Sequence, residues 1–291
     1  MSIGSWLVSA ILSVCLFHGA AQAAENVMDR YFTTSDGLKI HYLEAGTGSR
    51  AILFVPGWLM PAAIFEKQLL ALSRNYRVLA FDPRSQGRSG ISSGDHGPEI
   101  RMRDLDEFRI AAQVDEFVFV GWSLGVLETL DYIERYKPAG LKGAILIDNS
   151  IGEGAPPRPR PARFQDDLAN PERRVRYLTD FCSSIFHKTP PDAILQAVLA
   201  SALQVPPAAA RQTIGQPYPR TYWRNIVERL EVPILYAITP RLREQADALL
   251  RKKHAEVEIF EKAGHALFVD EAERFNAAVE RFAARAFAEG F

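Results

Sequence analysis

The sequence predicts an α/β fold in which a mostly parallel sheet is covered by helices on both faces. Short, continuous apolar runs alternate with amphipathic segments of helical periodicity over most of the chain. Such uninterrupted apolar runs are typical of parallel strands that are buried on both faces. Two further observations complete the pattern. A hairpin signal precedes the alternation, and a long segment without strand-like runs interrupts it in the second half.

The first 24 residues differ from the rest of the chain. Residues 6–17 are mostly apolar and uncharged, and the small-x-small pattern Ala21-Gln22-Ala23 follows them. We interpret residues 1–23 as a secretory signal peptide, with a buried N-terminal helix as the alternative. The apolar run is too short to span a bilayer. We therefore expect an exported protein, periplasmic or secreted, with no stable membrane anchor after cleavage. Cys182 would then be the only cysteine left, and we expect it to be a core residue.

The expected elements follow in chain order. Residues 31–34 and 38–43 resemble two strands joined by a tight turn at Asp36-Gly37. The later apolar runs predict parallel strands at 51–55, 77–81, 117–120, 144–147, 233–238 and 257–260. The segments between them predict helices at 62–74, 99–113, 124–136, 241–253 and 271–288.

Residues 149–225 break this alternation because they contain no convincing parallel strand. They open with a stiff, proline-rich connector at 152–161, and helix-like segments follow at 166–181 and 192–204. We interpret 149–225 as a helical cap inserted into a core made of 24–148 and 226–291. An irregular surface excursion without catalytic consequence is the alternative.

Composition limits the classes of partner. Hydrophobic residues make up 47% of the chain, charged residues 24%, and the net charge is −1. This balance argues against a nucleic-acid-binding protein, which usually has a basic surplus. The sequence contains no H-E-x-x-H motif, paired-cysteine motif or P-loop, so it implies no metal or nucleotide cofactor. The oligomeric state stays open.

One pentapeptide carries a chemical signal. Gly121-Trp122-Ser123-Leu124-Gly125 follows the apolar run at 117–120 and precedes a helix-like segment, which is the context of a nucleophile elbow. The chain must turn so tightly there that only glycines avoid collisions. Ser123 is therefore the candidate nucleophile. A serine that merely caps the following helix is the alternative.

A serine hydroxyl needs a neighbouring base to take its proton, and histidine suits that role because it titrates near neutral pH. His265 lies in a short glycine-containing loop directly after the last predicted strand. It is also the last histidine in the chain, which fits the order serine, acid, histidine. We predict His265 as the general base, with a structural loop histidine as the alternative.

With these motifs in place, the chain resembles an α/β-hydrolase of the small esterase and cofactor-free haloperoxidase-like group. Further matches are the segments at 54–58, 81–89 and 264–271, and the resemblance covers roughly 30–148 and 220–288. Two departures are visible. The family usually has His-Gly where Pro56-Gly57 stands and Gly-His where Ser85-Gln86 stands. Neither position is expected to carry chemistry.

The resemblance implies an oxyanion hole formed by the backbone amides of Trp58 and Leu124. It also implies an acid that orients the histidine. The family usually places an aspartate just after the strand at 232–238, and none stands there. Asp148, at the end of the strand at 144–147, is the preferred candidate, with Glu244 as the alternative. The side chain of Trp58 is expected either to line the acyl pocket or only to pack.

These residues predict a serine hydrolase that cleaves a small-molecule carboxylic ester through an acyl-serine intermediate. A serine at the elbow argues against the epoxide hydrolases and haloalkane dehalogenases of this fold, which use aspartate. Two alternatives remain. One is a cofactor-free perhydrolase or haloperoxidase-like enzyme with the same residues. The other is a non-catalytic binding protein on a hydrolase scaffold, which the missing aspartate favours.

Overall fold

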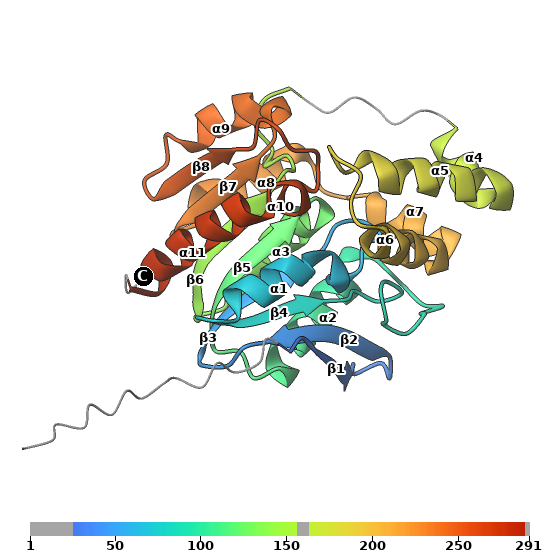
Figure 1. Cartoon of the computed structure of the whole chain (residues 1–291), viewed down its shortest axis with the longest axis horizontal. Helices are drawn as coiled ribbons and strands as arrows, with labels where there is room; N and C mark the ends of the chain where they lie inside the picture. Colours follow the sequence, from blue (N-terminus) through green and yellow to red (C-terminus); the bar gives the residue numbers. More distant parts are fainter. Residues whose placement is uncertain (1–25, 156–162, 289–291) are drawn as a thin grey trace, which may run out of the picture.

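An eight-stranded sheet forms the centre of the protein (Figure 1). The computed structural model describes residues 26–155 and 163–288, so the predicted signal peptide lies outside the described residues. The strand order is β1-β2-β4-β3-β5-β6-β7-β8. The strands are β1 (Met28–Thr33), β2 (Lys39–Ala45), β3 (Arg50–Val55), β4 (Arg77–Phe81), β5 (Glu116–Trp122), β6 (Leu141–Ile147), β7 (Ile234–Ile238) and β8 (Ala255–Ile259).

The pairing confirms the predicted, mostly parallel sheet. Strands β3 to β8 pair in parallel, and β1 and β2 form an antiparallel hairpin that adds to the edge of β4. The hairpin turns at Gly37, whose φ of 84° is readily adopted only by glycine. Because parallel strands end at one edge of the sheet, residues that follow β5, β6, β7 and β8 lie near one another.

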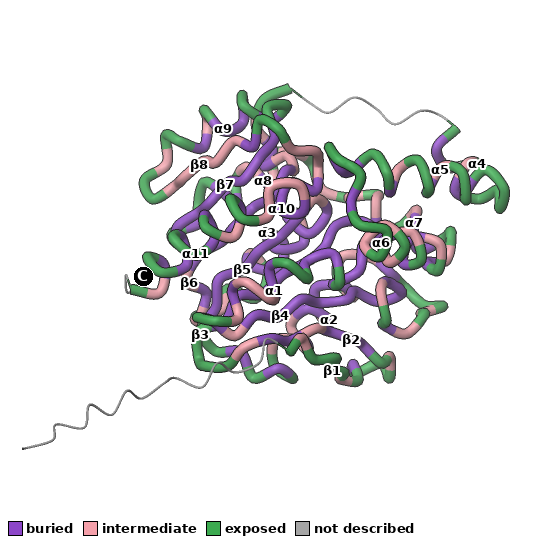
Figure 2. The backbone as a smooth tube through the Cα atoms, in the orientation of Figure 1, coloured by how far each residue is buried: buried purple, intermediate pink, exposed green. Residues whose placement is uncertain are grey.

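Helices cover both faces of the sheet, as the alternation of apolar runs predicts. One face is covered by α1 (Glu66–Leu72), preceded by the 3₁₀ helix η1 (Ala62–Phe65), and by α10 (Leu267–Asp270) and α11 (Ala272–Ala288). The other is covered by α2 (Pro98–Ala111), α3 (Leu124–Tyr136) and α9 (Arg243–Leu249), which the 3₁₀ helix η2 (Pro240–Leu242) precedes. Strands β2 to β7 and the inner sides of these helices are mostly buried, whereas β1 is mostly exposed and β8 is half-buried (Figure 2).

Five helices lie between β6 and β7, and four of them gather beyond one end of the sheet (Figure 1). They are α4 (Phe164–Ala169), α5 (Pro171–Ser184), α6 (Asp192–Gln204), α7 (Pro207–Ile214) and α8 (Arg220–Arg229). The helix expected at 166–181 is divided because Asn170 caps α5 and Pro171 cannot continue α4. Sequence reasoning missed α7 and α8. The predicted cap boundary at 225 falls inside α8, which packs against α3 of the core.

Hydrogen bonds attach this cap to the core. The Ser201 hydroxyl of α6 donates to the carbonyl of Leu59 at 2.8 Å and accepts from the amide of Gly87 at 2.9 Å. The indole of Trp58 donates to the carbonyl of Ala210 in α7 at 2.9 Å. In the described part of the chain no single helix could span a membrane by length and apolarity. Helices α6 and α7 pass that test only as a pair, with a 99° bend between them.

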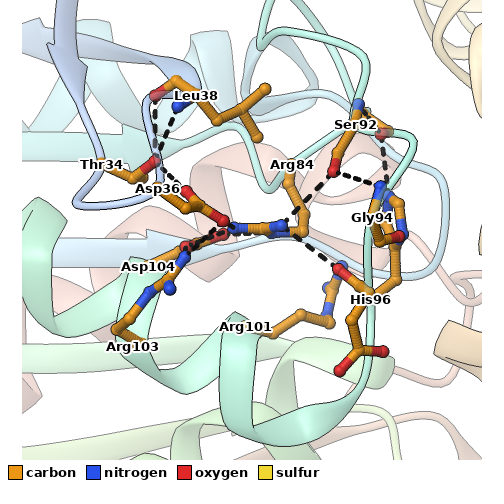
Figure 3. A network of polar contacts seen from close by, with 12 residues as sticks. Thr34, Asp36, Leu38, Arg84, Ser92, Gly94, His96, Arg101, Arg103 and Asp104 are labelled. Atoms are coloured by element: carbon orange, nitrogen blue, oxygen red, sulfur yellow. Dashed lines mark hydrogen bonds and ion pairs between the residues drawn. The ribbon is translucent and has the colours of Figure 1, made fainter.

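A buried arginine fixes the long loop between β4 and α2 (Figure 3). Arg84 donates from Nε and Nη2 to the carboxylate of Asp104 in α2, at 2.5 and 2.8 Å. It also donates to Asp36 of the hairpin at 3.1 Å and to the carbonyl of Asp95 at 3.2 Å. Arg84 and Asp104 are almost fully buried. One guanidinium therefore joins the hairpin, the loop and α2.

Candidate active site

Ser123 occupies a strained turn between β5 and α3. Its φ of 55° and ψ of −119° place a non-glycine residue in a sparsely populated backbone region. The flanking glycines are sterically required. A Cβ on Gly121 would lie 2.3 Å from the carbonyl oxygen of Gly125, and a Cβ on Gly125 would lie 2.3 Å from that of Val55. The tight strand–turn–helix geometry therefore exists at Ser123.

Neighbouring groups hold this turn. The amide of Ser123 donates to the carbonyl of Ile147 at 3.0 Å, across to β6. The carbonyl of Ser123 accepts from the side chain of Asn149 at 2.6 Å. Asn149 was not singled out from the sequence, and its place directly after β6 is the only signal that could have found it.

His265 lies beside the elbow. The indole of Trp122 donates to the backbone carbonyl of His265 at 2.9 Å, and the two rings are 5.3 Å apart between centroids. The loop of His265 is fixed at both sides. The amide of Gly264 donates to Asp270 at 2.8 Å, and the amide of Ala266 donates to the carbonyl of Ile185 at 2.7 Å. The His265 side chain keeps 23% of its surface exposed.

Asp148 contacts the histidine directly. Its Oδ2 atom lies 2.7 Å from Nδ1 of His265, and its Oδ1 atom accepts from the amide and the hydroxyl of Thr239 at 2.9 and 2.7 Å. The carboxylate is fully buried. Burial raises the pKa of Asp148, but the hydrogen bond and charge of His265, the charge of Arg241 and the Thr239 amide lower it to about 2. Asp148 is therefore ionised at neutral pH.

Glu244, the alternative acid, lies elsewhere. Its exposed side chain is in the first turn of α9. A Cβ added to Gly154 would lie 3.0 Å from the Glu244 carboxyl carbon, so this carboxylate contacts the segment that follows β6. Of the two candidate acids, the structure brings only Asp148 to His265.

Sequence reasoning missed Arg241. Its Nη2 atom donates to Asp148 Oδ2 at 2.7 Å and to the Asp148 backbone carbonyl at 2.8 Å, and it lies 3.1 Å from Nδ1 of His265. Arg241 follows β7, in the region where the resembling family usually places its aspartate. That position was its only signal in the sequence.

The predicted oxyanion donors lie next to Ser123. A Cβ on Gly57 would be only 3.0 Å from Cβ of Ser123, so the backbone before Trp58 adjoins the serine. Leu124 is the first residue of α3, where amides lack helical acceptors.

The carbonyl of Met60 accepts from the buried side chain of Gln86 at 3.0 Å. This gives a structural role to one of the two sequence departures.

The side chain of Trp58 lies under the cap. It is almost fully buried, and its ring lies 6.0 Å from that of Phe164 in α4 and 5.3 Å from that of Phe181 in α5. Trp58 was expected either to line the acyl pocket or only to pack, and these contacts describe packing between core and cap.

The buried His41 is paired with two carboxylates. His41 lies 2.7 Å from Asp82 and 2.9 Å from Asp29, which connects the hairpin to the end of β4. Cys182 is buried in the cap, and burial raises the pKa of its thiol to about 12. Across residues 26–155 and 163–288, no group of three or more His, Cys, Asp or Glu side chains has an arrangement suited to a metal ion.

Comparison with known proteins decides the family. A model described as "Alpha/beta hydrolase family" matches residues 52–278, which is most of the chain. The chain belongs to this family. The predicted resemblance is thereby confirmed, and its curated relatives among the α/β hydrolases include a non-heme haloperoxidase of Rhodococcus erythropolis. That relative is 35% identical over 120 residues, which are 40% of this chain and 43% of the relative.

Longer matches are more distant. The AB hydrolase superfamily protein YisY of Bacillus subtilis is 25% identical, and the match covers 88% of this α/β hydrolase and 99% of the relative. An esterase structure from Exiguobacterium antarcticum has a TM-score of 0.74 at 19% identity, covering 88% of this chain and all of that one. A bromoperoxidase structure from Bacillus anthracis has a TM-score of 0.75 at 19% identity, covering 88% and 99%. These structural likenesses support the fold.

Proposed function

We propose that this α/β hydrolase cleaves a small carboxylic ester through an acyl-serine intermediate, with Ser123 as nucleophile, His265 as base and Asp148 as acid. The observation that carries the proposal is the 2.7 Å contact between Asp148 and Nδ1 of His265, on a loop that packs against the residue before Ser123. An ionised carboxylate accepts a hydrogen bond from Nδ1–H, which holds the tautomer whose Nε2 is unprotonated and can take a proton from serine.

The steps follow from these positions. The Ser123 oxygen attacks the ester carbonyl carbon while its proton passes to Nε2 of His265, and the buried charge of Asp148 stabilises the imidazolium that forms. The carbonyl oxygen becomes an oxyanion, which the amides of Trp58 and Leu124 would bind. Collapse expels the alcohol, which takes the proton from His265. Water, deprotonated by His265, then attacks the acyl-serine carbonyl. The Ser123 oxygen leaves, takes the proton back from His265, and the carboxylic acid is released.

A second candidate uses the same residues. If hydrogen peroxide replaces water in the deacylation step, the product is a peracid in place of an acid. The names of the haloperoxidase relatives favour this candidate, although the aligned part covers less than half of the first two of them. A binding protein without catalysis is disfavoured because an ionised acid contacts the histidine although the usual aspartate is missing.

Labelling by a fluorophosphonate, together with hydrolysis of a short and a long p-nitrophenyl ester, tests the proposal. We expect wild type to be labelled and to turn over ester, and Ser123→Ala to do neither. Ser183→Ala is the matched control because Ser183 is an exposed serine of α5. A folded wild-type protein that is neither labelled nor active would refute the proposal. Faster formation of peracid than of carboxylic acid, in assays that contain hydrogen peroxide, would favour the second candidate.

A further inference from the structure

Arg241 shares the acceptor atom that the proposed triad uses. Its Nη2 atom and the Nδ1 atom of His265 both lie 2.7 Å from Oδ2 of Asp148. The two nitrogens are only 3.1 Å apart. A guanidinium donates hydrogen bonds and keeps its proton, so it stays positively charged beside the ring whether the ring is neutral or protonated.

Arg241 keeps 57% of its side-chain surface exposed, and contacts with Asp148 hold its guanidinium in this place. It forms a fork on Asp148, because Nε also lies 3.2 Å from Oδ2 and Nη2 donates to the backbone carbonyl of the same residue at 2.8 Å. Asp148 follows the last residue of β6 and has a left-handed backbone with a φ of 46°. Its backbone carbonyl accepts a hydrogen bond from Arg241. Arg241 therefore orients both the side chain and the backbone of the proposed acid.

The charge of Arg241 acts on His265 in one direction. Part of the Asp148 charge is neutralised by the guanidinium, and the guanidinium also repels an imidazolium at 3.1 Å. Both effects disfavour protonation of His265. A positive charge on the ring is therefore less favourable here than it would be beside Asp148 alone.

Other charged groups around His265 do not oppose this effect directly. Asp270 of α10 accepts from the backbone amides of Gly264, His187 and Lys188, so both of its oxygens have backbone donors. Next to Asp148, the Tyr236 hydroxyl donates to the carbonyl of Asn149, and Arg220 donates to Ser150. Among these groups, only Asp148 and Arg241 contact the imidazole.

We propose that Arg241 is a positioning residue for the triad, which orders Asp148 and extends the activity of the Ser123–His265 pair to lower pH. This inference rests on the proposed function for its catalytic meaning. Its electrostatic part concerns the ring alone and can be measured without any substrate.

Two substitutions separate the charge from the fork. Arg241→Gln keeps a hydrogen-bond donor but removes the charge, and we expect the acid limb of the kcat/KM profile for a p-nitrophenyl ester to rise by about one pH unit. Arg241→Lys keeps the charge but loses the planar fork, so we expect its acid limb to stay near that of wild type while the plateau falls. Arg243→Gln is the control because Arg243 is exposed and pairs with Glu261.

Titration of the His265 ring by NMR, assigned by its absence in His265→Ala, provides the second readout. We expect its midpoint to rise in Arg241→Gln by the same amount as the acid limb. An unchanged midpoint in folded Arg241→Gln would overturn the inference even if the protein is an esterase. A raised KM confined to anionic esters, without a shift of the limb, would also overturn it, because Arg241 would then bind substrate. A shifted midpoint in a protein without ester turnover would support the electrostatic inference and refute the proposed function.

Discussion

Replacing Asp148 by asparagine tests the proposed triad most directly. The carboxylate accepts hydrogen bonds from three residues, Thr239 on Oδ1 and both His265 and Arg241 on Oδ2. An amide has only one oxygen. With its NH₂ group at the Oδ2 position, it would face two donors, and with that group at the Oδ1 position, it would face the two donors of Thr239. Either orientation leaves a buried mismatch.

The size of the effect follows from the charge that is lost. With Nδ1 and Oδ2 2.7 Å apart, the charge centres of imidazolium and carboxylate are separated by about 4 Å. At an effective dielectric constant of about 20, the attraction is about 4 kcal/mol. Because the guanidinium of Arg241 neutralises part of the Asp148 charge, we reduce this attraction to about 3 kcal/mol of transition-state stabilisation. That value corresponds to a decrease of roughly a hundredfold or more in turnover.

The assay compares initial rates of p-nitrophenyl ester hydrolysis, corrected by fluorophosphonate titration of active sites, for wild type, Asp148→Asn and Glu244→Gln. We expect Glu244→Gln to stay within about twofold of wild type because its exposed carboxylate is in α9, beside Gly154. A folded Asp148→Asn enzyme with more than about a tenth of wild-type turnover would refute the reasoning, as would a larger loss in Glu244→Gln.

The lowered pKa of Asp148 predicts that the free energy of unfolding depends on pH, and Asp148→Asn tests this. The pKa of Asp148 is lowered from its ordinary 3.8 to about 2 in the folded protein, so the carboxylate stabilises the fold above pH 3.8 and that contribution is lost as the pH falls towards 2. The difference corresponds to about 2 kcal/mol. In urea unfolding, we expect the stability gap between wild type and Asp148→Asn to shrink as the pH falls from about 4 to 2. A gap that does not change over this range would contradict the assigned direction.

Three further substitutions or modifications test the surroundings. Gly57→Ala places a Cβ 3.0 Å from Cβ of Ser123 and should lower ester turnover at least about tenfold. The control Gly94→Ala places a Cβ 3.5 Å from a serine hydroxyl and should leave turnover unchanged. Equal rates in the two variants would argue that the backbone at Gly57 does not lie close to the reacting serine. Arg84→Met should lower the free energy of unfolding by about 3 kcal/mol, because the buried Asp104 carboxylate loses both of its hydrogen bonds from Arg84 and keeps the 3.2 Å contact with Arg103. Adding Asp104→Leu should recover part of that loss in urea unfolding. Cys182, with its pKa raised to about 12, should resist alkylation in the folded protein and react after denaturation, as read by mass spectrometry.

Local sequence determined the parts of this protein that depend on neighbours along the chain. Continuous apolar runs correctly located the six parallel strands of the described residues, most of which are apolar because both of their faces are buried. The hairpin signal at Asp36-Gly37 located β1 and β2. The elbow was equally readable. The glycines at 121 and 125 stand where any Cβ would collide with backbone, so the pattern itself reports the turn. The sequence likewise located His265 at a strand end.

Helix ends in the cap were partly readable. Pro171 is a strong signal against a single helix through 166–181, and giving it more weight would have found the break between α4 and α5. Helices α7 and α8 are short, and both begin after prolines. Their helical state depends on packing against the rest of the molecule, which periodicity over so few residues does not report.

Only the tertiary structure decided which acid reaches His265. Asp148 and Glu244 both follow strands that end at the same sheet edge, and strand order alone does not fix which side chain contacts a loop more than a hundred residues away from Asp148. The choice depends on the left-handed backbone at Asp148 and on the path of the chain through Thr239 and Arg241. Those are contacts between segments far apart in sequence. They arise when the sheet brings the ends of β6, β7 and β8 together, because hydrogen bonding between strands sets their distances.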